Sequence, residues 1–527
     1  MVQSVVRKWL DDPLVEIGSI FAEKYRKNES INIFSDFNIQ QCFLEVFNSD
    51  FHFEKIPSLE KTPNDLLFSG KLVRMTCMIQ DTNFGQEISM GAYKIKDKGW
   101  VLSRYDLFTL ERTILDLSDP TILLDERHCF YATSIPGESE WLNHDLVKEL
   151  NSLSLDTSLE TYISERFPLK NQKHLAVILK VYAGMETRFH VCDVVEVAGI
   201  FEKDVETIQE HMTNDQHIVK FQLPIIHVIH MNTINLNKLV TRSLGTIENG
   251  KKAGQIFFSK TSDIFCNDNL VAEFLLLSLV SSVSSRLSTM VLGSFPVNIR
   301  NCLPNMLSKF KEFLSNVLPA FIYEKIDIHT LNNNKFYPLS DGEKLQAGIM
   351  QLAKGTVVCF DETNMDEGTL NDTGVRNLRS LNQVILSQVL PFHFSFSEFE
   401  IETDLTIIVL SKTGKTLLPI DVSIPIKSQI SPDLKPFLHI ASDKLTSFRK
   451  YFATIRQLSV TISNEISERI QSDFVKQRQL GNKINEKEFG LRISLAKLFA
   501  KACGSETVLW NHWTNAVRLA SSLDISK

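Results

Sequence analysis

The chain has 527 residues, a length that predicts two to four domains. It carries 56 basic and 63 acidic side chains and a net charge of −7, which excludes a protein held to nucleic acid mainly by bulk positive charge. Hydrophobic residues make up 43% of the sequence, so the chain is expected to form packed globular domains.

Cysteine spacing and apolar segments limit the kinds of site and compartment. No Cys-x-x-Cys pair occurs, so zinc ribbons, redox pairs and iron–sulfur sites lack their usual ligand spacing. The longest apolar tract, Leu270–Val283, is shorter than the roughly 20 residues that span a membrane. No apolar segment of a signal peptide follows Arg7 and Lys8. The sequence predicts a soluble protein of a reducing compartment, cytosolic or nuclear, with no membrane partner.

Residues 1–68 are predicted to form helices joined by polar loops. Apolar residues recur there at helical spacing in two groups: Trp9, Leu10, Leu14, Ile17 and Phe21, then Ile39, Cys42, Phe43, Val46 and Phe47. Over 69–231 the pattern changes to short strands separated by turns, one of them at Asn83–Gly85, with a short polar insertion near 143–170. These strands favour a small barrel of the OB type, with an antiparallel sandwich as the alternative.

A loop-like segment rich in Asn, Lys and Gly, residues 232–254, is predicted to link this domain to the next. Residues 255–431 alternate helices and strands, and they include a strongly apolar helix over Leu270–Leu287. Strands are expected at Phe295–Ile299, Thr356–Phe360 and Thr406–Leu410, and a further helix at Met306–Leu318. This alternation predicts a doubly wound, mainly parallel sheet, followed by a helical domain over 432–527.

The segment Ser411–Thr416 looks like the end of a phosphate-binding loop. Such a loop needs Gly-x-x-x-x-Gly-Lys-Ser/Thr at the start of a helix, because the first glycine permits the turn whose N–H groups cradle phosphate. Val409 stands where that glycine is required, and Leu417–Ile426 contains two prolines and alternates like a strand. A hairpin turn is the better interpretation.

A second candidate is the strand that runs into Asp361 and Glu362, the pattern of a Walker B strand. In an ATPase the aspartate helps to hold Mg²⁺ and the glutamate activates the attacking water. The alternative is a strand that exits into an acidic loop. Upstream, the loop Arg300–Asn305 occupies the phosphate-loop place, yet it has no glycine, lysine, serine or threonine. The sequence predicts a domain shaped like a nucleotide-binding one that has lost the chemistry, with no cofactor and no catalytic residue.

Two weaker leads remain. His227 and His230 lie in a strand-like stretch, where residues three apart point to opposite faces, so we expect sheet-packed histidines and no metal site. Arg492 lies on the apolar helix Phe489–Ala502 and is open to two interpretations, a solvated side chain or one that reaches a neighbouring site.

Seven strings along the chain are distinctive, and several of them are long and unusual. They are Val73–Asp81, Met90–Tyr93, Phe130–Trp141 with its Pro-Gly-Glu-Ser core, Leu292–Asn298, Asp361–Thr363, Gly368–Leu381 and Leu417–Pro419. Through these strings most of the chain resembles the minichromosome maintenance complex-binding protein family. Relatives often carry a longer polar insertion where this chain has the short one near 143–170. No contact or targeting signal placed in that insertion can be carried over.

The resemblance implies an OB-type N-terminal part, a degenerate AAA+-like domain and a C-terminal helical lid. The strand Thr406–Leu410 then takes the sensor-1 place with Lys415 in the turn beyond, and the lid carries a sensor-2 arginine. The vestigial positions of the nucleotide site become Asn301, Asp361, Glu362 and Arg492.

The resemblance also implies a non-enzymatic function. Members of the family bind subunits of the minichromosome maintenance helicase and act in DNA replication, by assembling or escorting new subunits and by removing the complex from chromatin late in S phase. They are also linked to sister chromatid cohesion. These properties imply a nuclear protein whose association with chromatin is indirect, although no basic cluster suggests an import signal. An active AAA+-type ATPase and a single-strand DNA-binding protein acting through the OB-type domain are the alternatives.

Overall fold

The computed structural model describes most of the chain. The described residues are 2–25, 38–63, 66–95, 99–105, 120–142, 163–170, 172–182, 185, 188–203, 223–247, 250–287, 290–341, 344–394, 397–412, 416–427, 440–480 and 484–523. Lys415 and residues 143–162 of the polar insertion lie outside them. The chain divides into two compact units. The barrel unit comprises Met1–Pro136, Asn143–Ile234 and Leu339–Ala353, and the sheet unit comprises Gly137–Leu142, Asn235–Pro338 and Lys354–Lys527.

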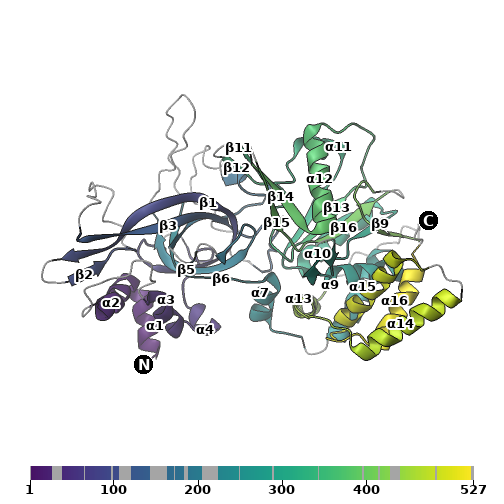
Figure 1. The fold of residues 1–527 in the computed structure, drawn as a ribbon, viewed down its shortest axis with the longest axis horizontal. Helices are drawn as coiled ribbons and strands as arrows, with labels where there is room; N and C mark the ends of the chain where they lie inside the picture. The colour runs from purple at the N-terminus through teal and green to yellow at the C-terminus, as the bar shows by residue number, and fades with distance from the viewer. Residues whose placement is uncertain are drawn as a thin grey trace. The chain divides into compact units, whose positions relative to one another are not determined.

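Six strands form the main sheet of the barrel unit. They are β1 (Leu72–Ile95), β2 (Gly99–Leu102), β3 (Ile122–Thr133), β4 (Ala176–Tyr182), β5 (Val194–Glu202) and β6 (Ile225–Thr233). The order β1-β3-β4-β6-β5 closes on itself because β5 also pairs with β1, and β2 extends β1 (Figure 1). Within the ring only β4 and β6 pair in parallel. Alternate residues of these strands fill an apolar interior.

Helices α1 (Val2–Asp11), α2 (Pro13–Tyr25), α3 (Ile39–Val46) and α4 (Asp50–Phe53) confirm the predicted N-terminal helices. The predicted apolar positions are the ones that pack. Trp9 stands edge-on to Phe43 at 5.6 Å between ring centres, and both are buried together with Ile229 of β6. A helical stripe therefore covers part of the outer surface of the barrel.

The predicted turn at Asn83–Gly85 is wrong. β1 continues through it and pairs with β3 on both sides, with Gly85 opposite Cys129. The pairing of β1 with β3 shifts in register on either side of Asp81, which accommodates the residues typical of a turn. The Oδ1 of Asp81 accepts a hydrogen bond from the N–H of Asn83. Residues that favour a turn thus form part of a bulged strand, because the long pairing with β3 outweighs their local turn preference.

Buried and half-buried charges gather around Lys180 of β4, outside the apolar interior. Lys180 Nζ lies 3.5 Å from a carboxylate oxygen of Glu87, and Arg127 Nε lies 2.5 Å from the same oxygen. Nearby, Arg104 Nε lies 2.5 Å from Asp125 Oδ2, with both side chains almost completely buried. Each described cation of this cluster therefore has a carboxylate partner.

Tyr182 continues this cluster. Its hydroxyl donates to the carbonyl of Arg104 and lies 2.8 Å from His227 Nδ1, while His227 Nε2 lies 3.0 Å from Glu202. Burial lowers the pKa of His227. His230 instead stacks on the ring of Phe43. Both histidines are packed on the sheet, as predicted, but the expectation that they point to opposite faces is wrong. A register shift between Ala198 and Gly199 of β5 leaves one extra residue of β6 between their partners, so both side chains lie on the outer face of the barrel.

The sheet unit is centred on parallel strands in the order β10-β13-β16-β9-β17. Their bounds are β9 (Val297–Arg300), β10 (Phe321–Lys325), β13 (Val357–Asp361), β16 (Thr406–Ser411) and β17 (Val422–Pro425). Helices α9 (Asn269–Val280) and α10 (Pro304–Val317) share an apolar core with one face of these strands. Figure 1 shows α11 (Ile328–Asn333) and α12 (Asp372–Ser387) on the other side of the sheet. The predicted strands and the parallel sheet are confirmed.

Three sequence predictions for this unit are wrong. The supposed linker 232–254 holds α7 (Leu236–Leu244) and the start of α8 (Gly250–Ile264), because its polar Asn235 caps α7 and its Leu236, Val240 and Ala253 are buried. The helix expected over Leu270–Leu287 ends at Val280. Beyond it the backbone makes hydrogen bonds outside the helix, such as the one from the N–H of Val283 to Asp404. The hairpin predicted at Ser411–Thr416 would pair β16 with β17, but these strands lie parallel on opposite sides of β9; residues 413–415 lie outside the described ranges.

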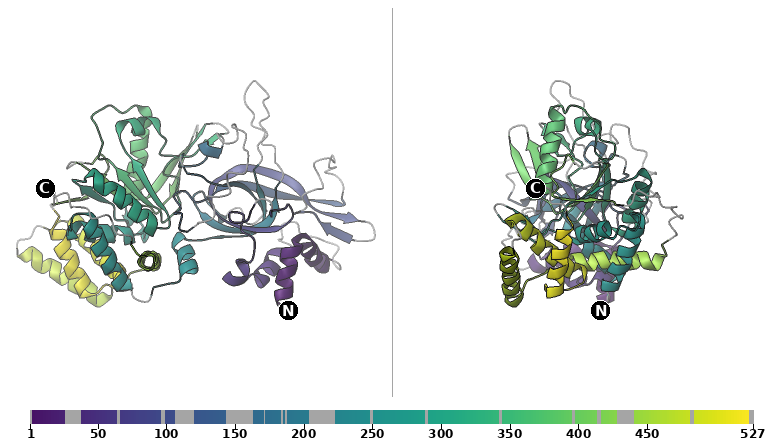
Figure 2. Two further views of the ribbon diagram at one scale, coloured as in Figure 1. Left: turned by 180° about the vertical axis from the view of Figure 1, so that it is seen from behind. Right: turned by 90° about the vertical axis from the view of Figure 1, so that its right-hand side faces the viewer.

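The remaining elements are short hairpins and a helical bundle. The hairpin strands are β7 (Ser285–Arg286) with β8 (Val291–Leu292), β14 (Val389–Phe394) with β15 (Glu398–Glu402), and, in the barrel unit, β11 (Leu339–Asp341) with β12 (Lys344–Gln346). The helices are α13 (Ser442–Arg456), α14 (Asn464–Gln479), α15 (Glu486–Ala502) and α16 (Trp510–Ser521), as expected for 432–527 (Figure 2). No helix in the described ranges is both long and apolar enough to cross a membrane.

Each unit includes one short segment whose neighbours in the sequence belong to the other unit. Gly137–Leu142 follows β3 in the chain but packs beside β10 of the sheet unit, where the N–H of Phe321 donates to the carbonyl of Gly137 at 2.9 Å. Gly137 has φ +73°, and a Cβ there would lie 2.7 Å from Ile322. The glycine of the Pro-Gly-Glu-Ser string is therefore required by both conformation and space.

Leu339–Ala353 does the converse, because it lies between β10 and β13 in the chain but belongs to the barrel unit. Gln351 Nε2 donates to the carbonyl of Gln80 at 2.9 Å, and the N–H of Ala347 donates to Glu165. Neither unit is therefore a continuous piece of sequence.

Candidate functional site

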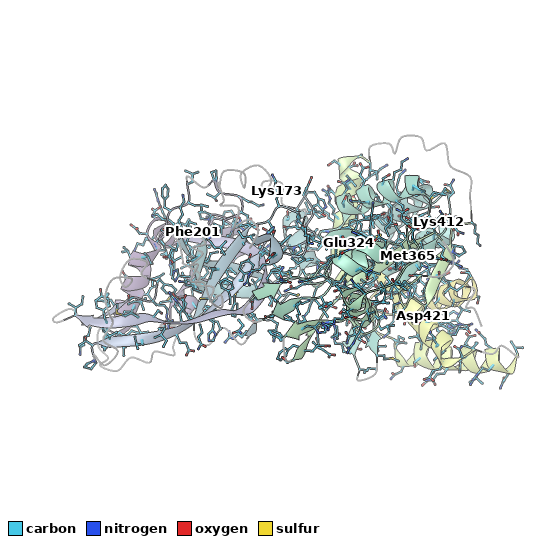
Figure 3. All side chains as sticks on the ribbon, turned by 90° about the horizontal axis from the view of Figure 1, so that it is seen from above. Lys173, Phe201, Glu324, Met365, Lys412 and Asp421 are labelled. Atoms are coloured by element: carbon cyan, nitrogen blue, oxygen red, sulfur yellow. The ribbon has the colours of Figure 1, made fainter. Side chains whose placement is uncertain are left out.

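The carboxyl edge of the parallel sheet gathers most of the predicted site positions. Asp361 ends β13 opposite Leu410 of β16, and Leu410 is in turn opposite Ile299 of β9, two residues before Asn301. Because the strands are parallel, Asn301 and Asp361 leave the same edge, about 10 Å apart across two strand spacings. Figure 3 labels Glu324, Met365 and Lys412, which lie at or just beyond the carboxyl ends of β10, β13 and β16.

The loop at the phosphate-loop position is three residues long and makes its own hydrogen bonds. Asn301 adopts a left-handed conformation with φ 62°, and its Nδ2 donates to the carbonyl of Ile426 at 3.4 Å. The N–H of Cys302 donates to the carbonyl of Ser411 at 3.2 Å. These two groups are directed at neighbouring strands, so they do not form the ring of free donors that cradles phosphate.

The helix that follows this loop offers little to an anion. Leu303 is the N-cap of α10 and provides no side-chain hydrogen bond, and Pro304 at the first turn has no N–H at all. The N–H of Met306 is used by the carbonyl of Leu303 at 2.9 Å. The described residues of this loop and helix start therefore do not fit a nucleoside triphosphate, since they supply none of the contacts that a phosphate loop makes to it.

Asp361 is buried and satisfied by neutral donors. Its Oδ2 accepts from the hydroxyl of Tyr323 at 2.6 Å, and its Oδ1 accepts from both the N–H and the hydroxyl of Thr363, at 2.9 and 2.6 Å. Burial, followed by the hydrogen bond to Asp361, raises the pKa of Tyr323, which keeps the phenol protonated. An Asp361 carboxylate held in this way would have to exchange these bonds for Mg²⁺ ligation.

Glu362 is also buried, but only one of its carboxylate oxygens is hydrogen-bonded. Thr416 and the N–H of Leu417 donate to the carboxylate, whereas Oε1 is buried without a partner among the described residues. Burial raises the pKa of Glu362, against the opposing effect of these two hydrogen bonds. The carboxylate faces the segment after β16, and its backbone N–H donates to Leu410 at 2.9 Å.

Arg492 belongs to the helical bundle and is only 6% exposed, so the solvated interpretation is wrong. Its guanidinium donates to Gln477 of α14 and to Glu488 one turn earlier on α15, both at 2.6 Å. No contact of Arg492 with Asp361 or Glu362 occurs in the part of the chain that the structure describes. These bonds hold α15 to α14, and the sensor-2 assignment stays a prediction.

Sequence reasoning did not place Tyr323, Thr363 and Thr416 beside the two carboxylates, where the structure has them donating hydrogen bonds. Only Thr363 carried a local signal, because a threonine two residues after an aspartate commonly donates back to it. Within the described ranges no group of three or more His, Cys, Asp or Glu side chains is arranged to hold a metal ion.

The geometry defines a class: a multidomain α/β protein with a closed five-stranded barrel and a five-stranded parallel sheet. The chain belongs to the family described as mini-chromosome maintenance replisome factor, whose sequence profile matches residues 43–166 and 147–523.

Relatives extend along nearly the whole chain. Over 519 residues it is 29% identical to UPF0616 protein C1687.04 of Schizosaccharomyces pombe, covering 96% of this chain and 99% of that protein. It is 25% identical to the proteins named Mini-chromosome maintenance complex-binding protein in Gallus gallus and Homo sapiens, over 98% and 97% of this chain and 96% of each relative.

Proposed function

We propose that this chain is a non-enzymatic regulator of DNA replication that binds subunits of the minichromosome maintenance helicase. Family membership supports the proposal, as do the printed names of the chicken and human relatives, which describe complex-binding proteins. Their alignments cover nearly the full length of this chain, so the likeness is not confined to one domain.

The architecture supports a finer proposal, that the chain is a distant relative of the helicase subunits themselves. In chain order, the ring of the barrel runs first, second, third, fifth, fourth strand, which is the connectivity of an OB-type barrel. The sheet runs second, third, fourth, first, fifth strand, and the loop after the first strand and the acids after the third fall where an AAA+ domain has its Walker motifs. We assign these parts as an OB-type barrel and a degenerate AAA+-like domain, with α13–α16 as its lid.

One observation carries the non-enzymatic part of the proposal. The loop between β9 and α10 uses the Asn301 amide and the Cys302 N–H internally, and Pro304 removes a donor from the helix start. A domain of this shape can present subunit-like surfaces without hydrolysing ATP. The mechanism we propose is mimicry, in which the chain occupies a subunit interface of the helicase ring.

The test is light scattering on a sizing column, with this protein mixed with purified helicase subunits and with the intact hexamer. We expect a defined heteromeric peak in the absence of nucleotide. Elution of the protein alone under every condition would overturn the proposal. ATP hydrolysis by the purified protein, lost in the Asp361→Asn and Glu362→Gln variants, would support an ATPase instead.

We extend the proposal to the cell cycle. A protein that shifts the association equilibrium of helicase subunits promotes either assembly or disassembly, depending on which state it binds more tightly. On this basis we propose that it resides in the nucleus, releases the complex from chromatin in late S phase and supports sister chromatid cohesion. Depletion should leave helicase subunits on chromatin after replication and separate sister chromatids early; normal release and cohesion would contradict this extension.

A further inference from the structure

The β14–β15 hairpin of the sheet unit has one free edge. β15 ends its sheet and pairs on one side only, with β14, among the described strands. Four of its five residues are exposed, and Phe399 is 58% exposed. Such an edge offers unpaired backbone groups to an added strand.

The register shows which backbone groups face that edge. The N–H of Phe394 donates to the carbonyl of Ser397, and the N–H of Thr403 donates to the carbonyl of Gln388, so both pairs occupy hydrogen-bonded positions of the ladder. Because hydrogen-bonded and non-hydrogen-bonded pairs alternate in an antiparallel ladder, the N–H and C=O groups of the intervening alternate residues point outward. Those residues are Glu398, Glu400 and Glu402.

The same three residues form a row of carboxylates on one face of β15, since alternate side chains share a face. The ends of the row already have cationic or protonatable neighbours, with His393 Nδ1 3.3 Å from Glu398 and Arg286 Nε 3.4 Å from Glu402. Glu400, in the middle, makes no ion pair within the described ranges. Arg286, which also donates to the carbonyl of Thr403, shows how a basic side chain sits against this strand.

We propose that β15 is a docking edge for an extended segment of another protein in which basic and apolar residues alternate. Such a segment pairs with the outward backbone of β15 and places its basic side chains opposite the glutamates. Its apolar side chains fall on the other face, beside Phe399 and Ile401. A second copy of β15 would set glutamate against glutamate, and nucleic acid would set phosphate against carboxylate, so charge disfavours both.

This inference goes beyond the proposed function, because it names the edge and the chemistry of the docked segment whether or not that segment comes from a helicase subunit. The probe is a fluorescent nine-residue peptide of alternating Lys and Val, titrated against the full-length protein by anisotropy. A peptide of the same composition, with all lysines at one end, is the control. We expect the alternating peptide to bind about tenfold more tightly than the control.

Substitutions at Glu400 separate the contribution of its charge to peptide binding from the contribution of its backbone N–H. Glu400→Lys should weaken alternating-peptide binding about tenfold or more, while Glu468→Lys, at an exposed position of α14, leaves it unchanged. Glu400→Pro should weaken binding more than Glu400→Gln, because it also removes the outward N–H while breaking no bond within the hairpin. If circular dichroism shows that the Glu400→Pro variant is unfolded, the Glu400→Gln and Glu400→Lys variants still test whether the glutamate contributes to peptide binding.

Three results would overturn the proposal: no peptide binding, equal binding of both peptides, or binding unaffected by every Glu400 variant. A dimer of the protein that dissociates when Glu400 is changed would assign the edge to a second copy and would also overturn it. Loss of peptide binding with helicase-subunit binding intact in Glu400→Lys supports the docking edge and leaves the proposed function standing.

Discussion

The charged cluster of the barrel unit and the carboxyl edge of the sheet unit both hold buried or half-buried carboxylates, but they satisfy them differently. In the barrel, Asp125 and Glu87 each meet a guanidinium at 2.5 Å. At the sheet edge, Asp361 meets only hydroxyl and N–H donors, and one oxygen of Glu362 meets no described partner. The barrel carboxylates depend on pairing with a cation. The hydrogen bonds at the sheet edge can also be made by a neutral amide, so we expect that edge to accept a neutral side chain. Mutations should therefore damage the barrel far more than the sheet edge.

The largest effect should come from Arg104→Met. It leaves the buried Asp125 without its partner, and breaking a buried pair in this way costs about 3–5 kcal/mol. The free energy of unfolding from urea titration measures it. The double variant Arg104→Met/Asp125→Leu should recover most of the loss, and a cost below about 1 kcal/mol for the single variant would remove the contrast between the regions.

Tyr182→Phe should come next. The change deletes the hydroxyl that donates to the Arg104 carbonyl and lies beside His227, leaving both groups buried without that partner. A cost of about 2 kcal/mol is expected. Tyr93→Phe, on a part of β1 outside this cluster, serves as the control; an equal loss in both variants would mean that the hydroxyl of Tyr182 contributes nothing specific.

Asp361→Asn should cost only about 1 kcal/mol, because the amide oxygen still accepts from Thr363 and the amide nitrogen can donate to the oxygen of Tyr323. Binding of helicase subunits on the sizing column should stay unchanged. A loss of binding with stability intact would give the carboxylate a role beyond the fold.

The smallest effect should come from Glu362→Gln and should appear mainly as a change in pH dependence. The pKa of Glu362 is raised above 4.5 in the folded protein, so the folded state takes up its proton at a higher pH than the unfolded chain. The wild type should thus gain stability relative to the variant as pH falls from neutral toward 4.5. Parallel stability–pH curves would show that the carboxylate is not destabilised by burial.

Local pattern was enough to predict the N-terminal helices and the strands β9, β13 and β16. Each of these depends on apolar periodicity or on residue types at fixed spacing. What could not be predicted depends on distant partners. Asn83–Gly85 became a strand because β3 pairs with it, and Arg492 turned to Gln477 of another helix.

The carboxylates of the site were likewise predicted by position but not by environment. Asp361 and Glu362 follow a buried strand, a signal visible in sequence. Their partners Tyr323 and Thr416 come from β10 and from the segment after β16. The order of the strands in the sheet brings these segments to one edge. No local pattern in a single sequence specifies that order, because it depends on contacts between residues far apart in the chain.

The exchange of short segments between the units has a consequence for synthesis. The barrel unit needs Leu339–Ala353, which the ribosome reaches only after the strands β9 and β10 of the other unit have been made. At about 5–20 residues per second, the nascent chain waits roughly 6–24 s between Ile234 and Ala353 before the barrel unit is complete. During that interval its N-terminal strands lack their final packing partner, so translation speed and chaperone access should govern the yield of the folded protein.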